Sequence, residues 1–257
     1  MYEAHFGLGE MPFALTPDPD FLFMHRQHQA ALQTLLAALA GGEGFVKVTG
    51  EVGTGKTLLC RRLLALLPSD VVSAYLLNPR LEPCALLGAL AAELSLPVPG
   101  GSDEHALYRL IENELMQLAA RGQRVVVCID EAQALPAASL EALRLLSNLE
   151  TSKRKLIQIA LFGQPELDEM LRTPALRSLA SRIGFGARLH GMTHTDLRRY
   201  LQHRLVVAGW KGHEVFSRAA SSLLWRLSGG VPRSVNLLAH QCLMLAYGRG
   251  LHTVGLR

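Results

Sequence analysis

The sequence predicts an α/β fold in which a parallel sheet is flanked by helices and followed by a small all-α domain. Two observations support this prediction. Short β-branched apolar runs alternate with segments of helical periodicity up to about residue 190, as in parallel sheets covered on both faces. After Gly191 the apolar spacing is helical and no further strand is expected. We therefore expect an α/β domain over 1–190 and a helical domain over 191–257.

The first 24 residues are expected to form an extended N-terminal segment. The stretch FGLGEMPFALTPDPDFLF contains prolines 12, 17 and 19, which disfavour a helix, and four phenylalanines, which can pack against a core. The beginning of the chain, MYEAHFGLGEMPF, has neither a basic start nor an apolar core region, so a signal peptide is not expected.

Each element is predicted from its local pattern of apolar residues. RVVVCID is the most apolar β-branched run and fits a strand buried on both faces. The expected strands are 44–50, 71–77, 124–130, 155–163 and 183–189. The expected helices are about 25–40, 57–67, 83–95, 103–121, 136–150, 165–171, 174–181, 194–208, 214–227 and 232–247.

Composition indicates a globular protein in a reducing compartment. Apolar residues make up 49% of the 257, enough for a buried core. The net charge of +4 permits an acidic partner without requiring one, and the basic residues are scattered. The four cysteines lie far apart without a CxxC pair, which argues against a disulfide framework or a zinc site. No apolar run is long enough to span a bilayer, so we expect a soluble cytoplasmic protein.

The stretch GEVGTGKT, Gly50–Thr57, matches GxxxxGK[ST] and lies between a predicted strand and a predicted helix. Its glycines allow backbone N–H groups to surround phosphate oxygens, and the dipole of the following helix adds to the attraction. Lys56 is expected to reach the β- and γ-phosphates, and the Thr57 hydroxyl to ligate Mg²⁺. The motif therefore predicts a nucleoside triphosphate site. The expected contact residues are Gly50, Glu51, Val52, Gly53, Thr54, Gly55, Lys56, Thr57 and Leu58.

Two carboxylates, Asp130 and Glu131, follow the buried strand in VVVCIDEAQ. Ligands of parallel sheets bind at the carboxyl ends of the strands, where the phosphate loop also begins. We expect Asp130 to hold Mg²⁺ through water, and Glu131 to orient and polarise the attacking water. The alternative is that the two acids cap the next helix, with Glu131 exposed.

Two further side chains are candidates for contact with the phosphates. Gln164, at the end of the fourth strand in LFGQPEL, could contact the γ-phosphate or the attacking water, and its alternative is an ordinary loop amide. Arg233, in SGGVPRSVN, lies in the first turn of a helix, where the dipole normally favours acidic residues. We expect it to face the γ-phosphate, and its alternative is a solvated surface charge. No NKxD-type guanine motif occurs, which favours ATP over GTP.

An arginine that acts on a neighbouring subunit is also expected. LRTPALRSLASRIGF supplies Arg172, Arg177 and Arg182 just before the fifth strand. Charge supplied in trans can accelerate phosphoryl transfer by several powers of ten. Arg182 is the preferred candidate and Arg177 the second, while a surface salt bridge is the alternative for either.

The order of these motifs resembles that of AAA+ ATPases, which have a P-loop NTPase fold. The motifs are, in order, GEVGTGKT, VVVCIDEAQ, LFGQPEL, SRI and GGVPRSVN, with PFALTPDPDFLF ahead of them. More narrowly, the chain resembles the family of general secretion pathway protein A and the MSHA-type pilus biogenesis ATPase, over about Tyr2 to Tyr247. The resemblance implies these roles: Walker A for Gly50–Thr57, Walker B for Asp130 and Glu131, sensor 1 for Gln164, arginine finger for Arg182 and sensor 2 for Arg233.

The resemblance also implies a cellular role. It implies Mg²⁺-dependent ATP hydrolysis, self-association as a ring or dimer, and assembly of type IV (MSHA-like) pilus or type II secretion machinery with partner proteins at the inner membrane. Secretion-type members carry a transmembrane helix and a peptidoglycan-binding region after the ATPase. This chain stops at Arg257 with neither, which favours the shorter pilus type and a cytoplasmic, at most peripheral, location, unless the chain is a truncation.

Two other functions remain open at this point. The first is an ATP-dependent DNA-binding regulator of the kind that selects targets for transposition, which has a similar core and a GQPEL-like segment. Neither a winged-helix domain nor a basic stripe is visible to support it. The second is a scaffold that binds ATP without useful turnover, and the presence of Lys56 and Glu131 argues against that function.

Overall fold

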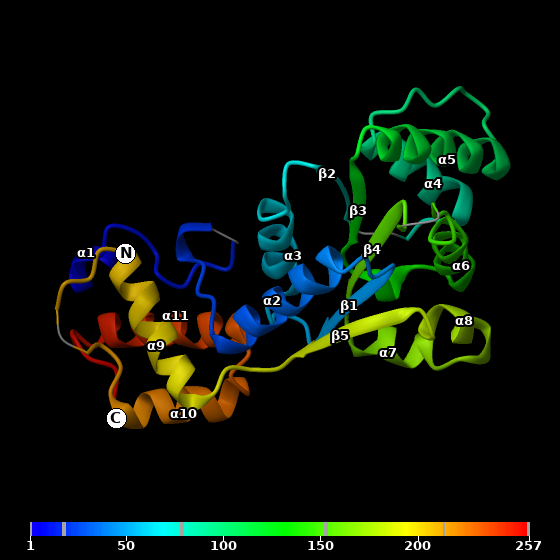
Figure 1. The fold of residues 1–257 in the computed structure, drawn as a ribbon. Helices are drawn as coiled ribbons and strands as arrows, with labels where there is room; N and C mark the ends of the chain where they lie inside the picture. Colours follow the sequence, from blue (N-terminus) through cyan, green and yellow to red (C-terminus); the bar gives the residue numbers. More distant parts are fainter. Residues whose placement is uncertain (1, 17–18, 78–79, 152–153, 213, 256–257) are drawn as a thin grey trace. The chain divides into compact units, whose positions relative to one another are not determined.

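The computed structural model describes residues 2–16, 19–77, 80–151, 154–212 and 214–255 (Figure 1). The chain forms two compact units that are not contiguous in sequence. The expected domain division at residue 190 stays a prediction. Residues 1 and 257, which end the two predicted domains, lie outside the described residues, as does Pro17 of the N-terminal segment. Unit 1 comprises Met1–His28, Val52–Leu58 and His190–Arg257, and unit 2 comprises Gln29–Glu51 and Leu59–Leu189.

Unit 2 is built on a five-stranded sheet with the strand order β2-β3-β4-β1-β5. All four pairings between neighbouring strands are parallel, which confirms the predicted α/β fold with a parallel sheet. Because the strands are parallel, their carboxyl ends meet at one edge of the sheet. The strands are β1 (Phe45–Gly50), β2 (Val71–Leu76), β3 (Arg124–Ile129), β4 (Ile157–Gly163) and β5 (Ile183–Leu189).

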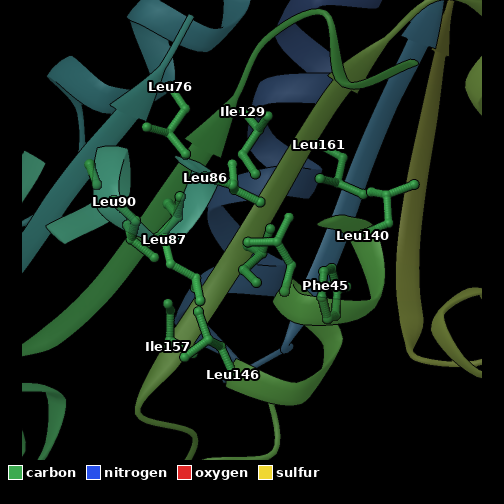
Figure 2. Close-up of a cluster of buried hydrophobic side chains, with 14 of the residues drawn as sticks. Phe45, Leu76, Leu86, Leu87, Leu90, Ile129, Leu140, Leu146, Ile157 and Leu161 are labelled. Atoms are coloured by element: carbon green, nitrogen blue, oxygen red, sulfur yellow. The ribbon is translucent and has the colours of Figure 1, made fainter. Parts of the chain in front are cut away.

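Helices cover both faces of this sheet. Figure 1 shows α4, α5 and α6 on one side, and α2 and α3 on the other. On the first side, alternate strand residues such as Ile129, Ile157 and Leu161 pack against leucines of the covering helices (Figure 2). On the other side the amide of Gln158 donates to the carbonyls of Leu39, at 2.9 Å, and Glu43, at 2.8 Å. The central strands are therefore buried on both faces, as the apolar run in β3 predicts.

The helices agree with the predicted ones except at their ends and in short turns. The expected helix 214–227 begins only at Arg218, because Ser217 caps it by accepting from the N–H of Ala220 at 3.1 Å. The helices are α1 (Glu3–Phe6), α2 (Arg26–Ala40), α3 (Lys56–Ala65), α4 (Pro83–Glu93), α5 (Glu104–Ala120), α6 (Ala137–Leu146), α7 (Pro165–Leu171), α8 (Arg177–Ala180), α9 (His194–Val207), α10 (Arg218–Ser228) and α11 (Pro232–Gly248). None of the helices within the described residues is both long and apolar enough to span a membrane.

The N-terminal segment is not extended throughout, contrary to the prediction from its prolines. It contains the single-turn helix α1 and a 3₁₀ turn, Pro19–Phe21, that begins at a proline. Proline is tolerated at the first position of a helical turn, because its missing N–H would have no partner there. The expected role of the aromatics is confirmed, since Tyr2, Phe6, Phe13 and Phe21 are buried in one cluster with residues of α9, α10 and α11.

Arg204 of α9 joins the N-terminal segment to the helical part of unit 1. It is 7% exposed, its Nε donates to the carbonyl of Pro12, and its Nη2 donates to that of Ala14 at 3.4 Å. The guanidinium carbon also lies 4.4 Å from the centre of the Phe21 ring. A buried charge is tolerated only where hydrogen bonds and aromatic faces replace its hydration. These contacts therefore hold Pro12, Ala14 and Phe21 against α9.

We predict that Arg204→Met lowers the free energy of unfolding by about 2–4 kcal/mol, because it removes the donor to the buried carbonyl of Pro12 and the cation from the Phe21 ring while preserving most of the packing. Urea unfolding followed by circular dichroism measures the change. Arg199→Met, at an exposed position of the same helix, is the control and is expected to change stability by less than about 0.5 kcal/mol. Equal effects of the two substitutions would contradict the prediction.

Candidate nucleotide-binding site

The predicted phosphate loop follows β1 directly and leads into α3, which begins at Lys56. Thr54 and Lys56 are 1% and 5% exposed, whereas Val52 is 51% exposed. Gly53 and Gly55 have φ of +82° and +94°, which only glycine adopts without strain. The loop therefore has the tight, glycine-dependent course that directs backbone N–H groups and a helix N-terminus towards an anion.

Arg233 lies against this loop within unit 1. Its backbone N–H donates to the carbonyl of Gly53 at 3.4 Å. A Cβ built on Gly53 would lie 2.5 Å from the Cβ of Arg233, a distance that side chains do not tolerate. The absence of a side chain at Gly53 is thus what permits α11 to begin beside the loop. The Arg233 side chain itself is exposed.

His28 supports the loop from the other side, a contact that the sequence did not indicate. Its Nε2 donates to the carbonyl of Thr54 at 2.8 Å, and a Cβ on Gly55 would lie 2.9 Å from the same atom. Since a carbonyl only accepts, Nε2 carries the hydrogen, and the buried Nδ1 has no hydrogen-bond partner among the described residues. Burial, and then the nearby His25, lower the pKa of His28 to about 4. The imidazole is therefore neutral at pH 7.

Asp130 directly follows β3 and is completely buried. The hydroxyl of Tyr75, on the neighbouring strand β2, donates to its Oδ2 at 3.4 Å, and the backbone N–H of Glu131 donates to its Oδ1 at 3.0 Å. Burial is the main cause that raises the pKa of Tyr75 to about 12, with the charge of Asp130 second. The Tyr75 hydroxyl therefore stays protonated and remains a donor to the carboxylate.

The carboxylate of Glu131 is held by two glutamine amides. Nε2 of Gln133 donates to its Oε2 at 2.6 Å, and Nε2 of Gln164 donates to the same oxygen at 3.0 Å. Glu131 itself has φ +53°, a left-handed conformation that is unusual for a residue with a side chain. Its side chain makes no capping bond to the following turn, Ala132–Ala134. Glu131 is half-buried and makes no capping bond, which disfavours the alternative of an exposed helix cap, while its expected role towards the attacking water stays a prediction.

The candidate arginines differ in their surroundings. Arg182 is half-buried, and its Nη1 donates to the hydroxyl of Ser147 at 3.5 Å, whereas Arg172 and Arg177 are exposed. Arg182 also lies near Glu141, whose pKa is lowered first by a hydrogen bond from Arg144 and to a smaller extent by the charge of Arg182. Arg182 is thus held at the end of α6, and its role in trans stays a prediction.

The side chains that were predicted to hold Mg²⁺ are of a chemical type suited to that ion. The hydroxyl of Thr57 and the carboxylate of Asp130 are hard oxygen donors of the kind that Mg²⁺ binds. Within the described residues, no group of three or more His, Cys, Asp or Glu side chains could hold a metal ion. A few protein oxygens are sufficient for Mg²⁺, which usually keeps several waters and is completed by substrate phosphates.

All four cysteines are free in the structure. Cys60 and Cys128 are completely buried, Cys242 is half-buried and Cys84 is exposed. The hydrogen bond with Cys128, and then burial, raise the pKa of the Cys60 thiol, so the thiolate is disfavoured there.

Comparison with known sequences supports the predicted resemblance. The sequence model of a family described as AAA domain matches residues 39–171. The chain is 46% identical over 254 residues to general secretion pathway protein A of Aeromonas hydrophila. The match covers 99% of this chain but 46% of that protein, so the chain spans about half the length of this relative.

Solved structures with the same fold include two proteins from archaea. Cdc6p from Pyrobaculum aerophilum matches with a TM-score of 0.69 and 18% identity, over 98% of this chain and 68% of that one. The ORC2 protein of Aeropyrum pernix, solved as ADPNP–ADP complexes, matches with a TM-score of 0.68 and 18% identity, over 96% and 69%. At this identity the likeness shows the fold alone, and it confirms the predicted P-loop NTPase architecture.

We predict that acidification destabilises the protein through His28. Its pKa in the folded state, about 4, lies below the ordinary value of 6.5, so the unfolded state binds more protons between these values. The contribution of neutral His28 is fully present above pH 6.5 and is lost as the pH falls towards 4. At pH 5 the loss is about 2 kcal/mol.

Urea unfolding at pH 7 and pH 5 measures this loss. His28→Gln is the reference variant, because its amide can still donate to the Thr54 carbonyl but does not titrate. The stability of the wild type should fall more steeply with acidification than that of the variant. Identical pH dependences would show that His28 is not the group responsible.

Proposed function

The chain belongs to the AAA domain family of P-loop NTPases, and on this premise we propose that it binds ATP with Mg²⁺ and hydrolyses it. The observation that carries the proposal is the hydrogen-bonded set at the ends of β3 and β4. A carboxylate that follows a Walker B strand, Glu131, is oriented there by the amide of Gln164 at 3.0 Å. A general base must be held in position to act on a water molecule.

Residues of the phosphate loop, Gly50–Leu58, would bind the triphosphate through backbone N–H groups and the Lys56 ammonium. Thr57 and Asp130 would hold Mg²⁺, which when bound offsets the charge that develops on the phosphate oxygens. Glu131 would take the proton of the attacking water, with Gln164 beside it on the γ-phosphate side. Arg233, in the first turn of α11 against Gly53, would contribute positive charge near the loop.

Self-association is part of the proposal, because the preferred arginine finger acts between subunits. Arg182 would reach the nucleotide of a neighbouring chain and stabilise the charge of the transition state there. Arg177, five residues earlier and exposed, is the second candidate. The turnover per chain then depends on the protein concentration, because only assembled chains have complete sites.

We predict that ATP turnover per chain rises with protein concentration and then saturates. Glu131→Gln should reduce kcat by about 100-fold or more, since a general base contributes roughly 10²–10⁴-fold, while ATP binding is retained. Arg182→Ala should reduce turnover and remove its dependence on concentration. Phosphate release measured over a range of protein concentrations tests both effects.

Arg172→Ala is the matched control, because Arg172 lies in the same segment and is exposed. If Arg177→Ala rather than Arg182→Ala abolishes the dependence on concentration, the finger is Arg177. A turnover rate that is independent of protein concentration, of Glu131→Gln and of both arginine substitutions would refute the proposed mechanism.

We further propose that ATP hydrolysis serves the assembly of type II secretion or type IV (MSHA-like) pilus machinery, with partner proteins at the inner membrane and the chain itself cytoplasmic. The support for this role is the 46% identity to general secretion pathway protein A. Because the chain spans 46% of that protein, the activity and partners of the whole relative remain part of the proposal.

We predict that the Glu131→Gln variant, loaded with ATP, retains its partners long enough to be isolated with them. Mass spectrometry of the co-purified proteins should identify pilus or secretion components, and Lys56→Ala, impaired in ATP binding, is the control that should lose them. Salt-dependent binding of DNA in the ATP state, with no envelope protein retained, would instead support the DNA-binding regulator.

A further inference from the structure

Gln133 uses both ends of its amide at the candidate site, although its place in the sequence gives it no assigned role. It lies half-buried in the 3₁₀ turn Ala132–Ala134, which follows the two carboxylates. Its Nε2 donates to Oε2 of Glu131 at 2.6 Å, and its Oε1 accepts from the backbone N–H of Gln164 at 2.9 Å. Gln133 therefore connects the end of β3 to the end of β4.

The chemistry of the partners fixes the orientation of this amide. An ionised carboxylate only accepts and a backbone N–H only donates, so the nitrogen of Gln133 must face Glu131 and its oxygen must face Gln164. The side-chain amide of Gln164 donates to the same Oε2 at 3.0 Å, which closes a three-residue ring. To bond both the Glu131 carboxylate and the Gln164 N–H, a side chain at position 133 needs a donor, an acceptor and the length of glutamine.

The surrounding backbone leaves room for the ring. A Cβ on Gly163, the last residue of β4, would lie 3.2 Å from Oε1 of Gln133 and 2.7 Å from Cδ2 of Leu167. Glu131 is held in a left-handed conformation, φ +53° and ψ 38°, which is sterically unfavourable for a residue with a side chain. Its orientation therefore depends on contacts such as the one from Gln133.

We propose that Gln133 is a positioning residue for ATP hydrolysis that acts through Glu131, with the backbone N–H of Gln164 as its anchor. It fixes the Glu131 carboxylate and couples it to the backbone of Gln164, so that the base and the residue beside the γ-phosphate keep one mutual geometry. This inference rests on the proposed ATPase function, because Glu131 is the group that Gln133 positions. Charge-assisted hydrogen bonds of this kind are stronger than neutral ones and restrict the accepting group most.

The test compares kcat, KM and the affinity for the non-hydrolysable analogue AMP-PNP in the full chain. Gln133→Met preserves the length of the side chain but removes donor and acceptor. It should lower kcat by at least about 10-fold, the scale of a misplaced catalytic group, with KM and the AMP-PNP dissociation constant within twofold of the wild type. Gln133→Glu, which sets two carboxylates against each other, should lower kcat at least as much.

Two controls separate positioning from stability. Gln158→Met removes an amide that also makes two hydrogen bonds, but to the carbonyls of Leu39 and Glu43 away from the site. It should lower the melting temperature and leave kcat of the folded fraction unchanged. In a Glu131→Gln background, Gln133→Met should leave the residual single-turnover rate unchanged within twofold, because the group on which it acts is gone.

An unchanged kcat in Gln133→Met would overturn the inference. So would a loss of AMP-PNP affinity in step with a lower melting temperature, as a general structural defect produces. A further 10-fold loss in the Glu131→Gln background would also overturn it, because Gln133 would then act independently of Glu131. If Glu131→Gln alone retains full turnover, the proposed hydrolytic mechanism fails, which is a different outcome from failure of Gln133 alone.

Discussion

Burial of the central strands β3 and β4 on both faces is the constraint on which the rest of unit 2 depends. Residues in β3 and β4 are covered on each side, so an unpaired polar group within them would lose its hydration without compensation. Gln158 satisfies this requirement with two carbonyl partners. The polar residues of the candidate site, Asp130, Glu131 and Gln164, follow the ends of these two strands, and there the sheet brings them together. Ile129 pairs with Leu161, so the residues that follow the two strands lie side by side.

This constraint explains why the fold and much of the candidate site could be predicted from sequence. A strand buried on both faces must be a continuous apolar run, and RVVVCID is visible as one without knowledge of its neighbours. The phosphate loop is equally local, because its glycines, Lys56 and Thr57 are close in the chain. The ends of elements were less predictable. The start of α10 at Arg218 depends on the cap from Ser217, a single hydrogen bond that periodicity does not register.

Long-range contacts explain what the sequence did not indicate. His28, near the start of α2, is separated from Thr54 by the rest of that helix and by β1, and neither residue type signals the hydrogen bond that joins them. Gln133 was visible within IDEAQ, but its acceptor bond to Gln164 exists only once β3 and β4 pair. In each case the sequence shows only a side chain that can both donate and accept a hydrogen bond. Its role becomes clear only when the fold shows which residue is its partner.

The composition of unit 1 gives the phosphate loop an unusual dependence on both ends of the chain. Residues 52–58 group with the N-terminal segment and with the C-terminal helices. His28 holds the carbonyl of Thr54, and the start of α11 rests on Gly53. The N-terminal segment and the C-terminal helices are themselves joined, because Arg204 holds the carbonyl of Pro12. A ligand that binds the loop therefore stabilises its contacts with the N-terminal segment and the C-terminal helices. By linkage, the packing of these two segments changes the affinity of the loop for its ligand. A chain that lost either end would retain every residue of the phosphate motif but lose one of the contacts that shape it.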